Sequence, residues 1–165
     1  MLHRYPLSTR AIQGARALNY SPDERWVDWA VRLLTEGADT PSLRIMAGLR
    51  PPFHYFEVTQ LLDRTLDELG VPALVEGEAA GAYAHDVVGE LVRSPESMNE
   101  VLAELNQLCI ATGYCSTLRP FYLLHFARID LAVRNCQYYW DGANRSNIDQ
   151  IVRDEAKRWL DSRTA

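Results

Sequence analysis

Metal ligation is the first chemistry that the side chains of this sequence could support. The chain holds four histidines, His3, His54, His85 and His125. None lies in a His-Glu-x-x-His or Glu-x-x-His pattern, the spacings that bring helical ligands to one ion. His85 and Asp86 with Glu90 offer candidate ligands, yet five residues set His85 and Glu90 well apart around a helix. We therefore expect no metal site and no cofactor.

Nucleophilic catalysis has no local signature either. The sequence contains no Gly-x-Ser-x-Gly elbow, and Cys109, Cys115 and Cys136 form no Cys-x-x-Cys pair. Their odd number argues against a disulfide framework and predicts reduced, mostly buried thiols. Cys109 and Cys115 flank a predicted helix end, where a thiol pKa can be lowered, but buried and inert thiols are the favoured interpretation. Gly77 and Gly81 lie among carboxylates that would repel a phosphate.

A predicted apolar helix from about residue 117 or 118 to residue 133 carries polar side chains on it and just beyond its end: His125, Arg128, Asp130 and Arg134. Charges among apolar residues must be paired or must line a cavity. Arg128 and Asp130 are two residues apart and cannot pair along a helix, so Glu57 is a candidate partner for Arg128. We favour a buried network that fixes helix register. The alternative is a small-ligand or catalytic pocket built from Glu57, His125, Arg128 and Asp130.

Acidic side chains are concentrated in residues 57–104. That segment has eleven acidic and two basic residues, a local net charge of −9 within a chain whose total is −5. Such a segment can steer a basic partner protein, whereas the net charge and the lack of a basic stripe argue against nucleic-acid binding. The predicted contact residues are Glu96, Glu100 and Glu104 at helical spacing, together with Asp63, Asp67 and Glu68.

Three consecutive aromatic residues, Tyr138, Tyr139 and Trp140, precede the last predicted helix. All three cannot face one core, so at least one is expected at the surface or over a groove. Because Tyr and Trp are enriched at binding hot spots, this segment is a second candidate contact site. The alternative, which we favour, is that the rings pack over the end of the bundle.

Helix signals recur along the chain, and no convincing strand pattern competes with them. Ser21 is predicted to cap a helix that ends at Gly37, and Thr40 one that ends at Gly48. The expected later helices cover residues 55–69, 73–92, from residue 94 to Gly113, 117–133, and the stretch after a Ser146 cap. We predict an all-α fold, a single compact bundle of six or seven helices around the apolar central helix 117–133. Because residues 73–92 contain several glycines, that helix is expected to be broken or very closely packed.

Length and composition fit one ordinary globular domain covering residues 1–165, in which residues 1–20 pack on the bundle or trail loosely. No apolar run approaches the roughly 20 residues that cross a bilayer, so no membrane contact is expected. The start of the chain lacks the apolar stretch of a secretory signal, which predicts a cytoplasmic protein.

Several short motifs resemble those of a set of uncharacterised small helical bacterial proteins. They include Trp29-Ala30, Ala47-Gly48-Leu49, Phe56-Glu57, Glu68-Leu69-Gly70, Tyr139-Trp140 and Asn147-Ile148-Asp149. Proteins of this appearance are similar to ones with toxin-neutralising, immunity-type roles. The resemblance implies an all-helical fold and a protein-binding role, and it brings no catalytic residues.

Three functional hypotheses follow. The first is a non-enzymatic bacterial protein-binding module, an immunity-type inhibitor whose acidic helical face occludes a basic partner. The second is a small-ligand-binding protein or enzyme with a polar pocket inside the bundle. The third is a structural homodimer that uses the small-residue helix over 73–92 as its interface.

Overall fold

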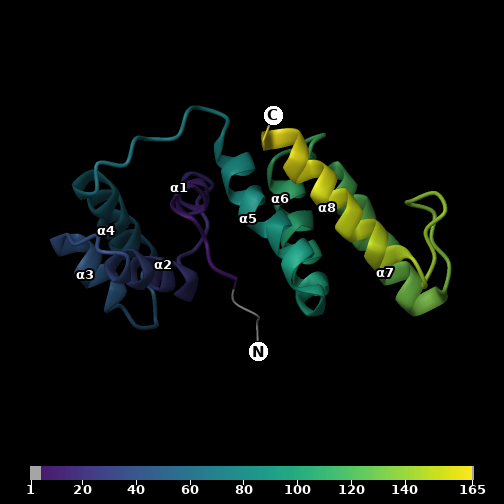
Figure 1. The fold of residues 1–165 in the computed structure, drawn as a ribbon, viewed down its shortest axis with the longest axis horizontal. Coiled ribbons are helices and arrows are strands. Elements are labelled where there is room, and N and C mark those ends of the chain that lie inside the picture. Colours follow the sequence, from purple (N-terminus) through teal and green to yellow (C-terminus); the bar gives the residue numbers. More distant parts are fainter. Residues whose placement is uncertain (1–4, 165) are drawn as a thin grey trace. The chain divides into compact units, whose positions relative to one another are not determined.

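The computed structural model describes residues 5–164, and in that range it contains eight α-helices, one short 3-10 helix and no strand (Figure 1). The predicted all-α class is therefore confirmed, with more helices than the six or seven expected. The chain divides into two compact units: an N-terminal unit, Arg4–Tyr83, and a C-terminal unit that includes Ala84–Ala165. None of the described helices combines the length and apolarity needed to span a membrane.

The N-terminal unit contains four complete helices, α1 (Thr9–Ala17), α2 (Glu24–Thr35), α3 (Pro41–Ala47) and α4 (Tyr55–Glu68). Helix α2 packs on α3, and α3 packs on α4. Their shared core is made of large side chains that are almost fully buried: Trp26, Trp29, Leu43, Met46 and Leu62. The Thr40 cap is confirmed, because its side chain accepts the N–H of Leu43. The Ser21 cap is wrong, since Asp23 caps α2 and accepts the N–H of Arg25 at 2.8 Å.

Helix α1 lies within the segment whose packing the sequence left open. Its residues Ala11, Ile12 and Ala15 are buried, and the Trp29 indole N–H donates to Thr9 Oγ1 at 3.0 Å. Residues 5–20 therefore pack on the rest of the N-terminal unit, while residues 1–4 lie outside the described range.

Helix α5 (Ala79–Arg93) crosses the boundary between the units and is continuous, although it was expected to start near residue 73. The expected close packing occurs at its first turns, but the glycine responsible belongs to α1. A Cβ placed on Gly14 would lie 2.5 Å from the Ala79 carbonyl oxygen and 2.9 Å from the Tyr83 nitrogen. Only glycine permits this distance between the two backbones.

The C-terminal unit contains the rest of α5, the 3-10 helix η1 (Pro95–Ser97), α6 (Met98–Ala111), α7 (Arg119–Arg134) and α8 (Ile148–Thr164). Helix α7 packs against both α6 and α8. Its core includes Leu102, Leu105, Phe121, Leu124 and Val152. The Trp159 indole N–H donates to the Thr117 carbonyl at 2.8 Å and fixes α8 beside the start of α7. Helix α8 begins at Ile148, two residues beyond the Ser146 that was expected to cap it.

Candidate functional site

Helix α7 carries apolar side chains on two opposite faces. The inward face buries Phe121, Leu124, Ala127 and Leu131. The outward face carries Tyr122, Phe126, Ile129 and Val133, which are half-buried or exposed. Of these, Ile129 is 43% exposed and Val133 is 74% exposed. The prediction of a central helix covered on several sides is therefore wrong, because the second apolar stripe of this helix faces outward.

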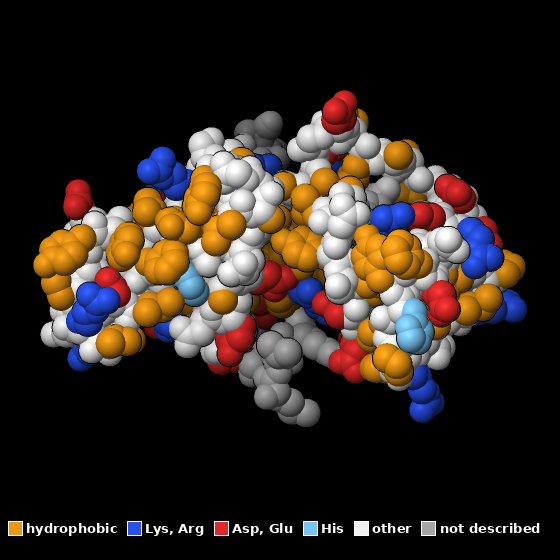
Figure 2. Space-filling view, turned by 180° about the vertical axis from the view of Figure 1, so that it is seen from behind, with side chains coloured by type: hydrophobic (Ala, Val, Ile, Leu, Met, Phe, Trp, Pro, Cys, Tyr) orange, Lys and Arg blue, Asp and Glu red, His pale blue; other side chains and the backbone are white. Residues whose placement is uncertain are grey.

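Aromatic rings follow this outward face in a continuous row. Tyr114, in the turn after α6, meets the Tyr122 ring edge-on with 5.5 Å between centroids. Tyr122 meets Phe126 at 5.0 Å, and Phe126 meets Tyr139 of the α7–α8 loop at 5.8 Å. The first two pairs are edge-to-face and the third is tilted, and ring pairs at these distances stabilise one another. In the view from behind, Figure 2 shows hydrophobic side chains gathered across the half of the molecule that holds the C-terminal unit.

The α7–α8 loop holds its aromatic residues through one half-buried amide. Gln137 Nε2 donates to the carbonyls of Trp140 and Ala143, and its Oε1 accepts the N–H groups of Tyr139 and Trp140. Tyr138 is left 92% exposed, while Trp140 is half-buried. The three aromatic residues were expected either to form a surface contact site or to pack over the end of the bundle. Trp140 is partly covered and Tyr138 projects outward, so neither interpretation describes all three.

The polar residues of α7 do not converge on a pocket. Arg128 donates to Asp149 of α8 at 2.8 Å and to Asn99 of α6, so its partner is not the expected Glu57. Asp130 lies 3.8 Å from Arg134 along the same helix. Glu57 belongs to the N-terminal unit, so no single unit holds the four predicted pocket residues. Arg128 thus joins α7 to α6 and α8 through exposed hydrogen bonds, whereas the favoured interpretation was a buried network.

His125 lies at the edge of the outward face, with its ring 5.2 Å from that of Phe126. Partial burial lowers the pKa of His125 below its ordinary value. The imidazole is therefore neutral at neutral pH and adds to the apolar character of this face.

The six acidic contact residues are divided between the units. Asp63 accepts two hydrogen bonds from Arg16, at 3.0 and 2.9 Å, and Glu68 accepts two from Ser42. Both carboxylates thus stabilise the N-terminal unit, while Asp67 beside them is exposed. Glu96 of η1 and Glu100 of α6 are exposed on the C-terminal unit, and Glu104 is half-buried there. No single unit presents all six as one acidic face.

The thiols have distinct environments. Cys109 is buried, Cys115 is half-buried and Cys136 is exposed, which corrects the expectation of mostly buried thiols. Burial raises the pKa of Cys109. A hydrogen bond with the Thr117 hydroxyl lowers the pKa of Cys115. Over residues 5–164, no three His, Cys, Asp or Glu side chains come together as metal ligands.

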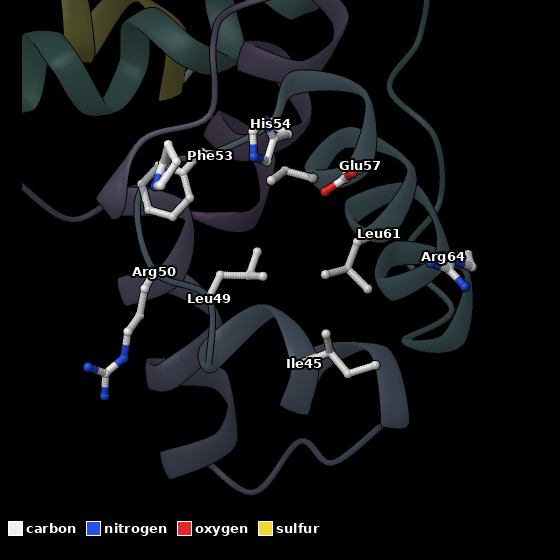
Figure 3. A pocket seen from close by; sticks show the side chains of 10 residues that line it. Ile45, Leu49, Arg50, Phe53, His54, Glu57, Leu61 and Arg64 are labelled. Carbon is white, nitrogen blue, oxygen red and sulfur yellow. The ribbon is translucent and has the colours of Figure 1, made fainter.

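A half-open cavity of about 240 Å³ lies at the surface of the N-terminal unit, between α3, the following loop and α4 (Figure 3). Figure 3 shows Ile45, Leu49 and Leu61 pointing toward one another across it. Glu57 lies on the α4 side of the cavity, so one of the predicted pocket residues does line a cavity. The other three predicted pocket residues, His125, Arg128 and Asp130, do not line it. The remaining lining residues are Arg50, Pro52, Phe53, His54, Val58 and Arg64.

The chain has no detectable match among protein-family models, curated proteins or solved structures. The geometry therefore supplies the functional argument.

Two features were not predicted from the sequence, the outward apolar stripe of α7 and the cavity of the N-terminal unit. Only the stripe is indicated by the spacing of its residues. Tyr122, Phe126, Ile129 and Val133 are spaced by four, three and four residues, as at a helix–helix seam. Reading that spacing beside the buried stripe would have predicted a second face. The cavity had no such signal, because its walls come from two helices and a loop whose packing the sequence does not specify.

Proposed function

We propose that this chain is a protein-binding module that contacts its partner through the outward face of α7. We call this surface the α7 face and define it by Tyr114, Tyr122, Phe126, Ile129, Val133, Tyr138 and Tyr139. The observation that carries the proposal is the second apolar stripe on α7. Contiguous apolar surface of this kind is expensive to leave in water and commonly marks an interaction site.

The spacing of the stripe favours a helix as the partner element. Side chains at intervals of four, three and four residues form a nearly straight row along α7, and such a row packs into the grooves of a second helix. Tyr114 lies at one end of the row, beside Tyr122, and Tyr138 is exposed in the loop whose Tyr139 contacts Phe126. Large rings already held in position lose little conformational freedom on binding, which favours affinity.

The charge of the chain favours a basic partner. Glu96 and Glu100 are exposed on the same unit as the α7 face, and the chain has a net charge of −5. Exposed carboxylates around an apolar contact speed the association of a cationic partner. The element proposed to bind the α7 face is thus an amphipathic helix with basic flanks. It belongs to a partner protein whose surface the chain would block, as an immunity-type inhibitor does.

A matched pair of variants tests this proposal. Val133→Asp places a charge on the α7 face at a position that is 74% exposed, and Val75→Asp makes the same change at a 68% exposed position in the N-terminal unit. Tagged wild-type and variant proteins are incubated with lysate of the native organism, and the captured proteins are identified by mass. We expect one stoichiometric basic protein with wild type and Val75→Asp, and its loss with Val133→Asp.

Two results would overturn the proposal. The first is equal capture of the same protein by all three chains, which would place the contact elsewhere. The second is a wild-type dimer by light scattering that Val133→Asp dissociates, which would make a second copy of this chain the occupant. Circular dichroism confirms that both variants remain folded.

A further inference from the structure

The cavity of the N-terminal unit is lined by two arginines that have no hydrogen bond or ion pair in the described part of the chain, although Arg64 acts electrostatically on Glu68, one turn further along α4. Twelve of the fifteen described arginines have a hydrogen bond, an ion pair or a cation–π contact. The remaining three, Arg50, Arg64 and Arg119, have none within residues 5–164. Two of these three, Arg50 and Arg64, line the same cavity.

The interior of the cavity is apolar. Its walls include Ile45, Leu49, Phe53, Val58 and Leu61. A dry apolar cavity of about 150 Å³ holds one benzene molecule, so a cavity of about 240 Å³ holds a body of roughly ten non-hydrogen atoms. Figure 3 places Arg50 and Arg64 on opposite sides of the cavity, with their side chains extended away from it. Either guanidinium therefore has to swing back toward the rim to meet the head group of a bound molecule.

We propose that this cavity binds a small organic anion, an apolar body of about ten non-hydrogen atoms that ends in one carboxylate. The body fills the space between α3 and α4, and the carboxylate lies at the rim within reach of Arg50 or Arg64. Among the lining residues, two guanidinium groups outnumber the single carboxylate of Glu57. Guanidinium groups also match the planar geometry of a carboxylate.

The charge of Glu57 should affect the affinity for the anion in the opposite direction from the charges of Arg50 and Arg64. Its carboxylate lines the cavity and has no hydrogen bond or ion pair in the described chain, so it repels an anionic head group. Neutralising Glu57 should strengthen the binding of the anion, whereas neutralising either arginine should weaken it. A cationic ligand would show the reverse pattern.

Three probes with one apolar body separate these cases: 3-phenylpropionate, 3-phenylpropan-1-ol and 3-phenylpropylamine. Each is titrated into ¹⁵N-labelled full-length protein and followed by amide chemical shifts, a method suited to the millimolar affinity expected of so small a ligand. We expect 3-phenylpropionate to bind most tightly, with the largest shifts at Leu49, His54 and Glu57.

The variants then test the charges. We expect Arg50→Gln and Arg64→Gln each to weaken 3-phenylpropionate binding roughly two- to fivefold, and Glu57→Gln to strengthen it by a similar factor. Arg119→Gln, an exposed and equally unpaired arginine of the C-terminal unit, should leave the affinity unchanged.

Preference for 3-phenylpropylamine would overturn the proposal, as would an affinity for 3-phenylpropionate that neither cavity arginine affects. Amide shifts that do not saturate, or that avoid the lining residues, would overturn it as well. The site is independent of the α7 face, so a failure here leaves the protein-binding proposal untouched.

Discussion

Glu68, the last residue of α4, accepts two hydrogen bonds from Ser42, one from the backbone N–H at 2.9 Å and one from the hydroxyl at 2.7 Å. Ser42 is the second residue of α3, so the carboxylate satisfies an N–H group at a helix start and joins the two helices. An acidic residue that looks like part of a solvated cluster in the sequence thus has a structural role.

This contact predicts an acid-dependent loss of stability. The hydrogen bonds from Ser42 hold the pKa of Glu68 below its ordinary value of about 4.5. A carboxylate whose folded-state pKa is depressed adds stability above its unfolded pKa and loses it as the pH falls through the folded value. Glu68→Gln should therefore lower the free energy of unfolding at neutral pH, and its difference from wild type should shrink below about pH 4.

Urea unfolding of both proteins at several pH values measures this difference. Asp67→Asn is the control, because the Asp67 side chain is exposed and has no hydrogen bond or ion pair in the described chain. A constant gap between Glu68→Gln and wild type across the whole acid range would contradict the prediction.

A second prediction concerns the contact of α1 with α5. Gly14→Ala would press a methyl group against the backbone of Ala79 and Tyr83, so the helices must separate. We expect a loss of about 1–3 kcal/mol in the free energy of unfolding, as for other overpacked sites. A loss of that size lowers Tm by roughly 2–4 °C per kcal/mol in a chain of this length.

Gly89→Ala is the matched control for this experiment. A Cβ at Gly89 meets only the flexible Arg93 side chain, at 2.9 Å, and alanine raises helix propensity by about 1 kcal/mol. This variant should therefore be neutral or stabilised. Equal losses in both variants would show that the close contact at Gly14 has no special cost.

The sequence predicted the helices whose ends are encoded locally. Thr40 begins α3 as expected, and α4 ends just before Gly70, whose φ of +66° suits glycine. Helix α1 was missed because its packing depends on Gly14 meeting α5 more than 60 residues later. The position of α5 was misjudged for a related reason, since nothing local marks its start at Ala79.

The candidate site was only partly predictable. Tyr138 and Tyr139 were chosen for their residue types, and the structure places both on an exposed surface. Their neighbours Tyr122 and Phe126 belong to the helix that was expected to be central, because the sequence of an apolar helix does not show which of its faces is covered by other helices. The pairing of Arg128 with Asp149 could not be predicted from the sequence either, since the path of the α7–α8 loop decides which residues of the two helices lie side by side.

A third prediction concerns that loop. Gln137→Ala removes the four hydrogen bonds that hold residues 139–143. Loss of a half-buried amide of this kind costs at most about 1–3 kcal/mol, and here the cost should fall on the loop rather than on the helices. Hydrogen exchange should accelerate at Tyr139 and Trp140 and stay unchanged in α6. Gln150→Ala, on the exposed side of α8, is the control, and unchanged loop exchange in Gln137→Ala would contradict the prediction.

The cysteines supply a fourth prediction. Because the pKa of Cys115 is lowered and that of Cys109 is raised, at neutral pH Cys115 has the larger thiolate fraction. Iodoacetamide at neutral pH should label Cys115 at least several-fold faster than Cys109, which is buried. Thr117→Val removes the hydroxyl partner and should slow the labelling of Cys115, as followed by mass spectrometry of its peptide. Equal labelling rates in Thr117→Val and wild type would show that the hydroxyl has no influence.

The last prediction separates local steering from overall charge in partner binding. Glu96→Lys with Glu100→Lys reverses two exposed carboxylates on the unit that holds the α7 face. With the partner captured through that face, we expect association to slow about tenfold at low ionic strength and the difference to shrink as salt is added. Asp67→Lys with Glu76→Lys makes the same change on exposed residues of the N-terminal unit.

Both double variants change the net charge from −5 to −1, so a global effect would slow them equally. Stopped-flow or surface-plasmon measurements at several salt concentrations give the association rates. A slower rate only for the Glu96 and Glu100 variant places the steering charges beside the α7 face. If both variants associate as fast as wild type, the exposed carboxylates do not guide the partner, and the apolar row alone must account for recognition.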